Sequence, residues 1–403
     1  MTNPGQMTWR ALLACVAGLC IGNIGWWIQP VLIGQLVGGV GLSESNAGLV
    51  ASVELGALAL SSVSLPRLFP TARLRTIALG GALVAIAAAA VSVAVDAFPQ
   101  LLAARAFVGL GEGAAFMAAN MATARFPDPD RAFGKINFAN VVFGIALVSS
   151  NPLFSGIVGR TAALPALLAA LLLLTPLLVL LPASMRVTEG EVTAVGSRRA
   201  ATAARSWVIA MLSISFFLVA VMSASIWAFY ALIGTQDGLT ESEVDSAIAV
   251  AVFAALIGSG VVPLVGKSLG RVLPVTTGIL LLAGSVDTLC LWHSALAFRV
   301  ATCVNVAANY VILPYYFAAA ADEDPSGHGT AAIGGTFLIV GAIGPYLGGL
   351  LMQTVGLRTI AVLMLVTGTA AWVLFVLANV ALRRRTPAGG APVAQTPAGE
   401  AAG

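Results

Sequence analysis

Four ionisable side chains lie inside long apolar stretches of the sequence: Glu54, Arg105, Glu112 and Arg299. An ionisable group within a membrane-spanning helix usually faces a water-filled cavity or a partner, so it marks a candidate functional site. Burial disfavours the charged form of a carboxyl group and a nearby guanidinium favours it, and a group balanced between these effects can load and release a proton near neutral pH. We therefore interpret Glu112 as the first candidate for a proton-coupling residue and Glu54 as the second.

The two arginines are candidates for binding an anionic substrate. Arg105, Gly109 and Glu112 fall at i, i+4 and i+7, which places them on one face of a helix. Arg105 and Glu112 would then be about 10 Å apart along the helix axis, so they need not pair directly. Glu112 has two open interpretations, proton coupling or simple neutralisation of a neighbouring arginine. Arg299 begins its apolar stretch, where it either binds an anion or extends to the membrane surface.

Aromatic and amide side chains form a second set of candidates. Three residues share one face of the first apolar stretch: Asn23, Trp27 and Pro30. The same spacing returns 200 residues later in Ser223, Trp227 and Tyr230. A third stripe has its members at i, i+4 and i+11: Asn305, Asn309 and Tyr316. Trp and Tyr also serve as anchors at membrane interfaces, so both interpretations stay open for each aromatic residue. The position of Trp27 and Trp227 well inside their stretches favours substrate binding.

The elements that must position these residues are membrane-spanning helices. The chain is 59% hydrophobic and 9% charged, whereas a soluble domain is about one-quarter charged, so a water-soluble fold is excluded. The apolar runs are continuous rather than alternating, which favours helices over a barrel and an all-α fold. We predict about twelve spans, near 10–37, 45–66, 76–96, 100–124, 135–158, 162–184, 206–234, 245–266, 274–294, 295–321, 330–355 and 357–381.

The basic residues predict the orientation of these spans. Of the 20 Lys and Arg residues, sixteen lie at one set of helix ends and only Arg160 and Arg358 lie at the other. Cytoplasmic loops carry the excess of positive charge, so we expect a multi-pass protein of the inner (plasma) membrane with both termini cytoplasmic. The net charge of +3 follows from this topology, and we expect no nucleic-acid partner. The four cysteines lie in apolar spans and the two histidines are far apart, so we expect no metal site and no cofactor.

An internal repeat divides the chain into two halves. The polar segment 186–205 leaves six predicted spans on each side, and the motif Gly41-Leu42-Ser43-Glu44-Ser45 returns as Gly238-Leu239-Thr240-Glu241-Ser242. We predict that Ser43 and Thr240 are N-caps and that Thr240 forms a capping box with Glu243. The predicted organisation is a tail (1–8), a bundle (9–185), a cytoplasmic linker (186–205), a second bundle (206–385) and a disordered tail (386–403).

Several motifs resemble those of the major facilitator superfamily, and the resemblance spans residues 9–385. The segment Arg105-Ala106-Phe107-Val108-Gly109-Leu110-Gly111-Glu112-Gly113 is similar to the family's pattern in helix four. Gly266-Lys267-Ser268-Leu269-Gly270-Arg271 is similar to its cytoplasmic loop motif without the acidic residue, and Gly341-Ala342-Ile343-Gly344-Pro345 is similar to its antiporter motif. The resemblance implies two six-helix bundles that rock about a central cavity.

The candidate gating or structural residues are Pro30, Gly109, Gly113, Lys267, Gly270, Arg271, Gly344 and Pro345. For Gly109 and Gly113, which form a Gly-x-x-x-Gly pattern, close helix packing is the simplest role. The predicted function is proton-coupled symport of a small amphipathic organic molecule, with an organic anion as the best guess, by a monomer in the lipid bilayer. One alternative is an efflux antiporter for hydrophobic or cationic compounds, and another is a membrane receptor or sensor with a transporter fold. The sequence has no nucleophile, histidine and acid set, so we expect no enzyme.

Overall fold

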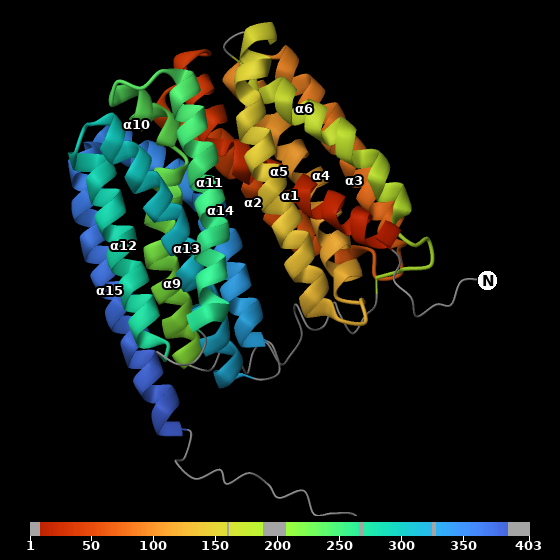
Figure 1. The fold of residues 1–403 in the computed structure, drawn as a ribbon. Helices are drawn as coiled ribbons and strands as arrows, with labels where there is room; N and C mark the ends of the chain where they lie inside the picture. The colour runs from red at the N-terminus through yellow and green to blue at the C-terminus, as the bar shows by residue number, and fades with distance from the viewer. Residues whose placement is uncertain (1–8, 159–160, 188–206, 266–269, 325–327, 386–403) are drawn as a thin grey trace, which may run out of the picture.

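The computed structural model describes residues 9–158, 161–187, 207–265, 270–324 and 328–385, and within these ranges the chain is helical, with one isolated bridge between Arg73 and Arg186 (Figure 1). The helices of the first half are α1 (Trp9–Gly38), α2 (Glu44–Leu68), α3 (Leu74–Ala94), α4 (Phe98–Thr123), α5 (Pro129–Val158), α6 (Ala163–Leu174) and the 3₁₀ helix η1 (Thr175–Leu180). Those of the second half are α9 (Trp207–Trp227), α10 (Tyr230–Gln236), α11 (Glu241–Val265), α12 (Val272–Leu291), α13 (Ala295–Glu323), α14 (His328–Thr354) and α15 (Gly356–Arg385).

Eleven segments in the described part of the chain are long and apolar enough to cross a membrane. Helix α11, with 25 residues, is also long enough to do so, and together they match the twelve predicted spans. The predicted all-α membrane fold is therefore confirmed. The predicted linker and the two tails fall almost entirely on residues 1–8, 188–206 and 386–403, which lie outside the described residues.

Two predicted spans differ from single α-helices. The predicted span 206–234 is divided, because α9 ends at Trp227 and α10 begins at Tyr230. At this break the Phe229 N–H donates to the Ile226 carbonyl, three residues back, instead of to the carbonyl four residues back as in an α-helix. The predicted span 162–184 changes from α6 to the 3₁₀ helix η1 at Thr175, next to Pro176.

The repeated motif has the same local structure in both halves. Gly41 and Gly238 have φ values of 80° and 86°, a region that glycine adopts without steric cost. They lie shortly after the ends of α1 and α10, where the chain leaves the helix. Ser43 accepts a hydrogen bond from the Asn46 N–H, and Thr240 and Glu243 bond each other's backbone N–H groups. Both predicted caps and the capping box are confirmed. The first turns of α2 and α11 are therefore built alike.

The helices form two bundles, α1 to η1 and α9 to α15, that diverge at one end and meet at the other (Figure 1). The start of α1 and the end of α15 lie at the diverging end, which we call the terminal side; the opposite end is the far side. The bundles meet where α2 packs on α14 and α5 packs on α11. At the first of these contacts Gly48 lies against the Pro345 carbonyl, and the Tyr346 N–H donates to Ser52 Oγ at 2.9 Å.

Candidate functional site

A cavity of about 290 Å³ lies between the two bundles. Six of its lining residues are asparagines: Asn23, Asn120, Asn137, Asn140, Asn305 and Asn309. Its aromatic wall consists of Trp26, Trp27, Phe116, Phe133, Phe216, Trp227, Tyr310 and Phe337. No Asp, Glu, Lys, Arg or His is among the described residues that line it. The cavity therefore offers flat apolar faces and neutral hydrogen-bonding groups.

Five of the predicted substrate-binding residues line this cavity: Asn23, Trp27, Trp227, Asn305 and Asn309. In the second bundle, Asn305 Oδ1 accepts from Ser223 Oγ at 3.0 Å, and Asn305 Nδ2 donates to Ser285 Oγ at 3.0 Å. Asn309 Nδ2 donates to Ser223 Oγ at 2.6 Å. These bonds hold α9, α12 and α13 together beside the cavity, so this part of its wall is preorganised.

The tryptophans close the cavity towards the far side. The Trp26 and Trp227 rings are nearly parallel, with centroids 6.5 Å apart and planes at 20°, and Trp227 Nε1 donates to the Trp26 carbonyl at 3.3 Å. Trp27 Nε1 donates to Asn140 Oδ1 at 3.3 Å, and its ring packs directly on Gly144. Because Trp26 and Trp227 belong to different bundles, their contact is part of the inter-bundle surface.

Three residues of the second bundle that we predicted near the substrate, two aromatic and one basic, do not line the cavity. Tyr230 is fully buried beside the cavity wall, with its ring 5.3 Å from Trp227 in an edge-on arrangement. The Tyr316 hydroxyl is 2.6 Å from Ser215 Oγ inside the second bundle, so Tyr310 takes the cavity position on α13 instead. Arg299 forms a half-exposed ion pair with Glu243, N to O distance 3.0 Å, away from the cavity.

Arg105 is buried inside the first bundle rather than in the cavity. Its guanidinium forms an ion pair with Glu54 of α2, and Arg105 Nε donates to Glu54 Oε2 at 2.9 Å. Glu112 is also fully buried and lies within electrostatic range of both. Arg105 is the only buried basic side chain in the described ranges. The structure thus brings Glu54, Arg105 and Glu112 into one cluster, which we call the buried triad.

Glycines allow the three helices of the buried triad to approach closely. Gly109 of α4 packs on the Glu54 carbonyl, and Gly113, one turn further, packs on Ser61. On the other side of Glu54, a Cβ added at Gly25 of α1 would lie 2.6 Å from Glu54 Oε1. The next residue in the chain, Trp26, lines the cavity, so the buried triad lies directly behind the cavity wall.

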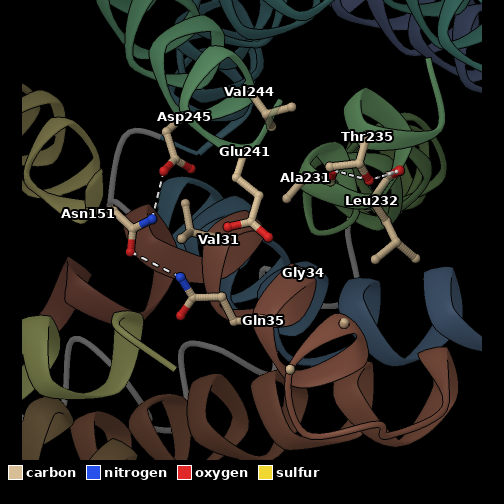
Figure 2. Close-up of a pocket in the computed structure, with 12 residues that line it drawn as sticks. Val31, Gly34, Gln35, Asn151, Ala231, Leu232, Thr235, Glu241, Val244 and Asp245 are labelled. Carbon is tan, nitrogen blue, oxygen red and sulfur yellow. Dashed lines mark hydrogen bonds between the residues drawn. The ribbon is translucent and has the colours of Figure 1, made fainter. Parts of the chain in front are cut away.

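A second cavity, of about 340 Å³, lies on the far side between α1, α5, α10 and α11 (Figure 2). A chain of hydrogen bonds crosses it: Gln35 Nε2 donates to Asn151 Oδ1 at 3.2 Å, and Asn151 Nδ2 donates to Asp245 Oδ2 at 2.6 Å (Figure 2). Since Asp245 belongs to the second bundle, this chain joins the two bundles; we call it the far-side latch. Sequence reasoning missed all three residues, although each is a polar group within an apolar stretch.

The remaining gating candidates lie at helix contacts and helix ends. Gly344 packs on Ala224 of α9, and Pro345 belongs to the contact with α2 described above. Pro30 is buried in α1. On the terminal side, Gly270 has a φ of 65°, and Arg271 forms an ion pair with Asp322 at 2.6 Å, so an acid from a neighbouring helix supplies the charge that the loop motif lacks. Lys267 lies outside the described residues.

Solved structures that share this arrangement of helices include two of one nucleoside transporter. The crystal structure of the nucleoside transporter NupG has a TM-score of 0.72 and 12% identity, and the alignment covers 94% of this chain and 100% of that one. A point mutant of the same transporter gives a TM-score of 0.73 and 12% identity, covering 93% and 99%. At this identity the likeness shows the fold alone. No curated protein matches the sequence.

The fold and the cavity between its bundles define a polytopic membrane protein of the secondary-transporter class. Residues 212–401 match the family model described as Major Facilitator Superfamily. The match covers the second half of the chain, so that half is similar to this superfamily, with the subfamily unresolved. Similarity to a transporter family indicates a small-molecule substrate and a place in the lipid bilayer.

Proposed function

We propose that the chain is a proton-coupled transporter that moves a small amphipathic organic molecule across the plasma membrane by alternating access. The observation that carries this proposal is the buried triad, which contains two carboxyl groups and one guanidinium. The triad is electrically neutral only when one carboxyl group holds a proton. A net charge at the centre of a membrane helix costs about 2.5–3.5 kcal/mol or more, so the neutral form is favoured in this conformation.

Glu112 is the carboxyl group to which we assign the proton, because Glu54 accepts the hydrogen bond from Arg105. Movement of α1 or α4 that admits water would separate the charges and release this proton. On α4, Phe116 and Asn120 follow Glu112 at i+4 and i+8 and line the cavity. Substrate and proton would therefore act on the same helix, which is what coupling requires.

The described lining of the cavity has no charged side chain, which favours an uncharged substrate over the organic anion that the sequence suggested. Arg105 is paired with Glu54 and Arg299 with Glu243, and neither lines the cavity. The two structural neighbours are transporters of nucleosides, which are uncharged amphipathic molecules, so nucleosides are reasonable first test compounds. Efflux by antiport is a second candidate, which the aromatic wall of the cavity favours.

The test is transport in proteoliposomes with an imposed pH gradient. We expect a substrate to accumulate with the proton gradient, whereas antiport would require the opposite gradient. Glu112→Gln should lose gradient-driven accumulation but keep exchange of labelled for unlabelled substrate, because glutamine retains size and polarity without titrating. Glu243→Gln, at a half-exposed carboxylate outside the triad, is the matched control and should behave as wild type. Full gradient-driven accumulation by Glu112→Gln would rule out the proton assignment.

A further inference from the structure

The hydrogen bonds within the cavity show which atoms its asparagines offer to a ligand. Asn23 Nδ2 donates to the Leu19 carbonyl at 2.8 Å, and Asn120 Nδ2 donates to the Phe116 carbonyl at 2.8 Å. Asn309 Nδ2 likewise donates to the Asn305 carbonyl at 3.1 Å, in addition to its bond to Ser223. A backbone carbonyl can only accept, so each of these three amides must turn its NH₂ group towards its own helix.

The amide oxygens are consequently the groups that these three asparagines leave for a ligand. Within the described ranges no donor is bonded to Oδ1 of Asn23, Asn120 or Asn309. Asn23 and Asn120 belong to the first bundle and Asn309 to the second. A ligand that donates to all three would contact both bundles at once. These three residues thus give the cavity neutral acceptors, whereas Asn140, whose Oδ1 accepts from Trp27 Nε1, keeps its amide donors.

The aromatic wall and the absence of charge restrict the ligand further. Trp26 and Trp227 have nearly parallel planes, and a flat ring system packs best against such faces. A charged ligand would leave water without a compensating partner, since no acidic or basic side chain is among the described lining residues. The acceptors in the cavity are amide oxygens, and no carboxylate is among the described lining residues. They therefore suit a neutral molecule with N–H and O–H donors better than they suit a cation.

We propose that the central cavity binds an uncharged, flat heteroaromatic molecule whose edge carries several N–H or O–H donors, which the amide oxygens of Asn23, Asn120 and Asn309 accept. The proposal rests on the proposed transport function and specifies its substrate class. It predicts selectivity by charge: among compounds with the same ring, the uncharged one binds most tightly.

The experiment is a binding assay on purified protein in nanodiscs with three matched series of probes. They are nicotinamide, nicotinate and 1-methylnicotinamide; indole-3-acetamide, indole-3-acetate and tryptamine; and uracil and orotate. We expect the uncharged member of a series to bind at least tenfold more tightly than its charged relatives. A charged member that binds as tightly as its uncharged relative, or failure of every uncharged probe to bind, would overturn the proposal.

Substitutions of an asparagine whose amide oxygen would accept from the ligand give a second test in the same binding assay. Asn309→Leu should weaken binding of the uncharged probes at least tenfold, and Asn309→Asp, which keeps an acceptor and adds negative charge, should shift preference towards tryptamine. Asn379→Leu is the matched control, because Asn379 Nδ2 also donates to the carbonyl four residues back, Phe375, but lies in α15 outside the cavity. Unchanged binding in Asn309→Leu would exclude Asn309 as an acceptor. Binding needs no pH gradient, so failure here is distinguishable from failure of proton coupling.

Discussion

At the scale of single residues, the contact between Glu54 and α1 depends on the absence of a side chain at Gly25. A methyl group there would come within 2.6 Å of Glu54 Oε1, closer than real contacts of this kind. Glu54 is buried between α1, α2 and α4, so it has little room to move aside. Gly25 therefore couples the position of the buried triad to the position of its neighbour Trp26.

We expect Gly25→Ala to slow gradient-driven transport about tenfold, because overpacking of a buried site typically costs 1–3 kcal/mol and here displaces Glu54 from Arg105. Initial rates of uptake in proteoliposomes, with and without a pH gradient, measure the effect. The control is Gly80→Ala in α3, where no atom lies within 4 Å of the added Cβ. Equal rates for the two variants would show that Gly25 has no role in coupling.

The sequence supported only part of the buried triad. The spacing of Arg105 and Glu112 along one helix is visible in the sequence, and both were predicted as functional residues. Glu54 was predicted as a functional residue too, but its pairing with Arg105 was not. Glu54 lies 51 residues away on α2 and meets Arg105 only where Gly109 lets the two helices cross closely. Helical periodicity relates residues within one helix and carries no information about contacts between helices.

At the scale of helices, the far-side latch joins α1 and α5 of one bundle to α11 of the other. Removal of its charged acceptor by Asp245→Ala should shift the protein towards a conformation that is open on the far side. A hydrogen bond to a charged group contributes about 1.5–3 kcal/mol, so the shift in population should be tenfold or more. Distances between spin labels at positions 97 and 236, at the far ends of the two bundles, measure the opening.

Glu241→Ala is the matched control for this prediction. Glu241 lines the same far-side cavity and is also acidic, but it is not a member of the latch (Figure 2). We expect it to leave the distance distribution close to that of the wild type. If Asp245→Ala and Glu241→Ala change the distances equally, the effect comes from charge in the cavity and not from the bond to Asn151.

The helices themselves were largely predictable, because hydrophobic runs, caps and positive-φ glycines are all local features. The predicted span 45–66 corresponds to α2 (Glu44–Leu68), with Ser43 as its cap. The break between α9 and α10 was not predictable, since it falls at Ala228 and Phe229 without a proline or glycine. Phe229 is fully buried and packs against Gly348 of α14, so packing between helices, and not local propensity, accompanies the break.

At the scale of the whole molecule, the distribution of basic residues predicts which side faces the cytoplasm. We expect a cysteine introduced for Gln236, on the far side, to react with a membrane-impermeant thiol reagent in intact cells. A cysteine introduced for Arg131, on the terminal side, should react only after the membrane is permeabilised. Both positions are exposed in the structure, so access to water is comparable. Labelling of position 131 from outside would reverse the predicted orientation.

The sequence repeat predicted two bundles but could not indicate at which end they meet. That end is set by contacts between residues far apart in the chain, such as Gly48 with Pro345 and Asn151 with Asp245. In the proposed alternating-access cycle, the same residues would separate when the cavity opens to the far side. The repeat in the sequence describes the two bundles themselves, whereas these contacts belong to the conformation that the structure shows.

The contact between Trp26 and Trp227 gives the protein a built-in optical signal. Two of its seven tryptophans meet across the boundary between the bundles, and the Trp227 N–H is bonded to the Trp26 backbone. Indole emission moves to longer wavelength when the ring becomes hydrated and changes in intensity when a neighbouring ring departs. The proposed alternating-access cycle would separate the bundles on the far side. It should therefore change the wavelength and the intensity of the tryptophan emission of the unlabelled protein.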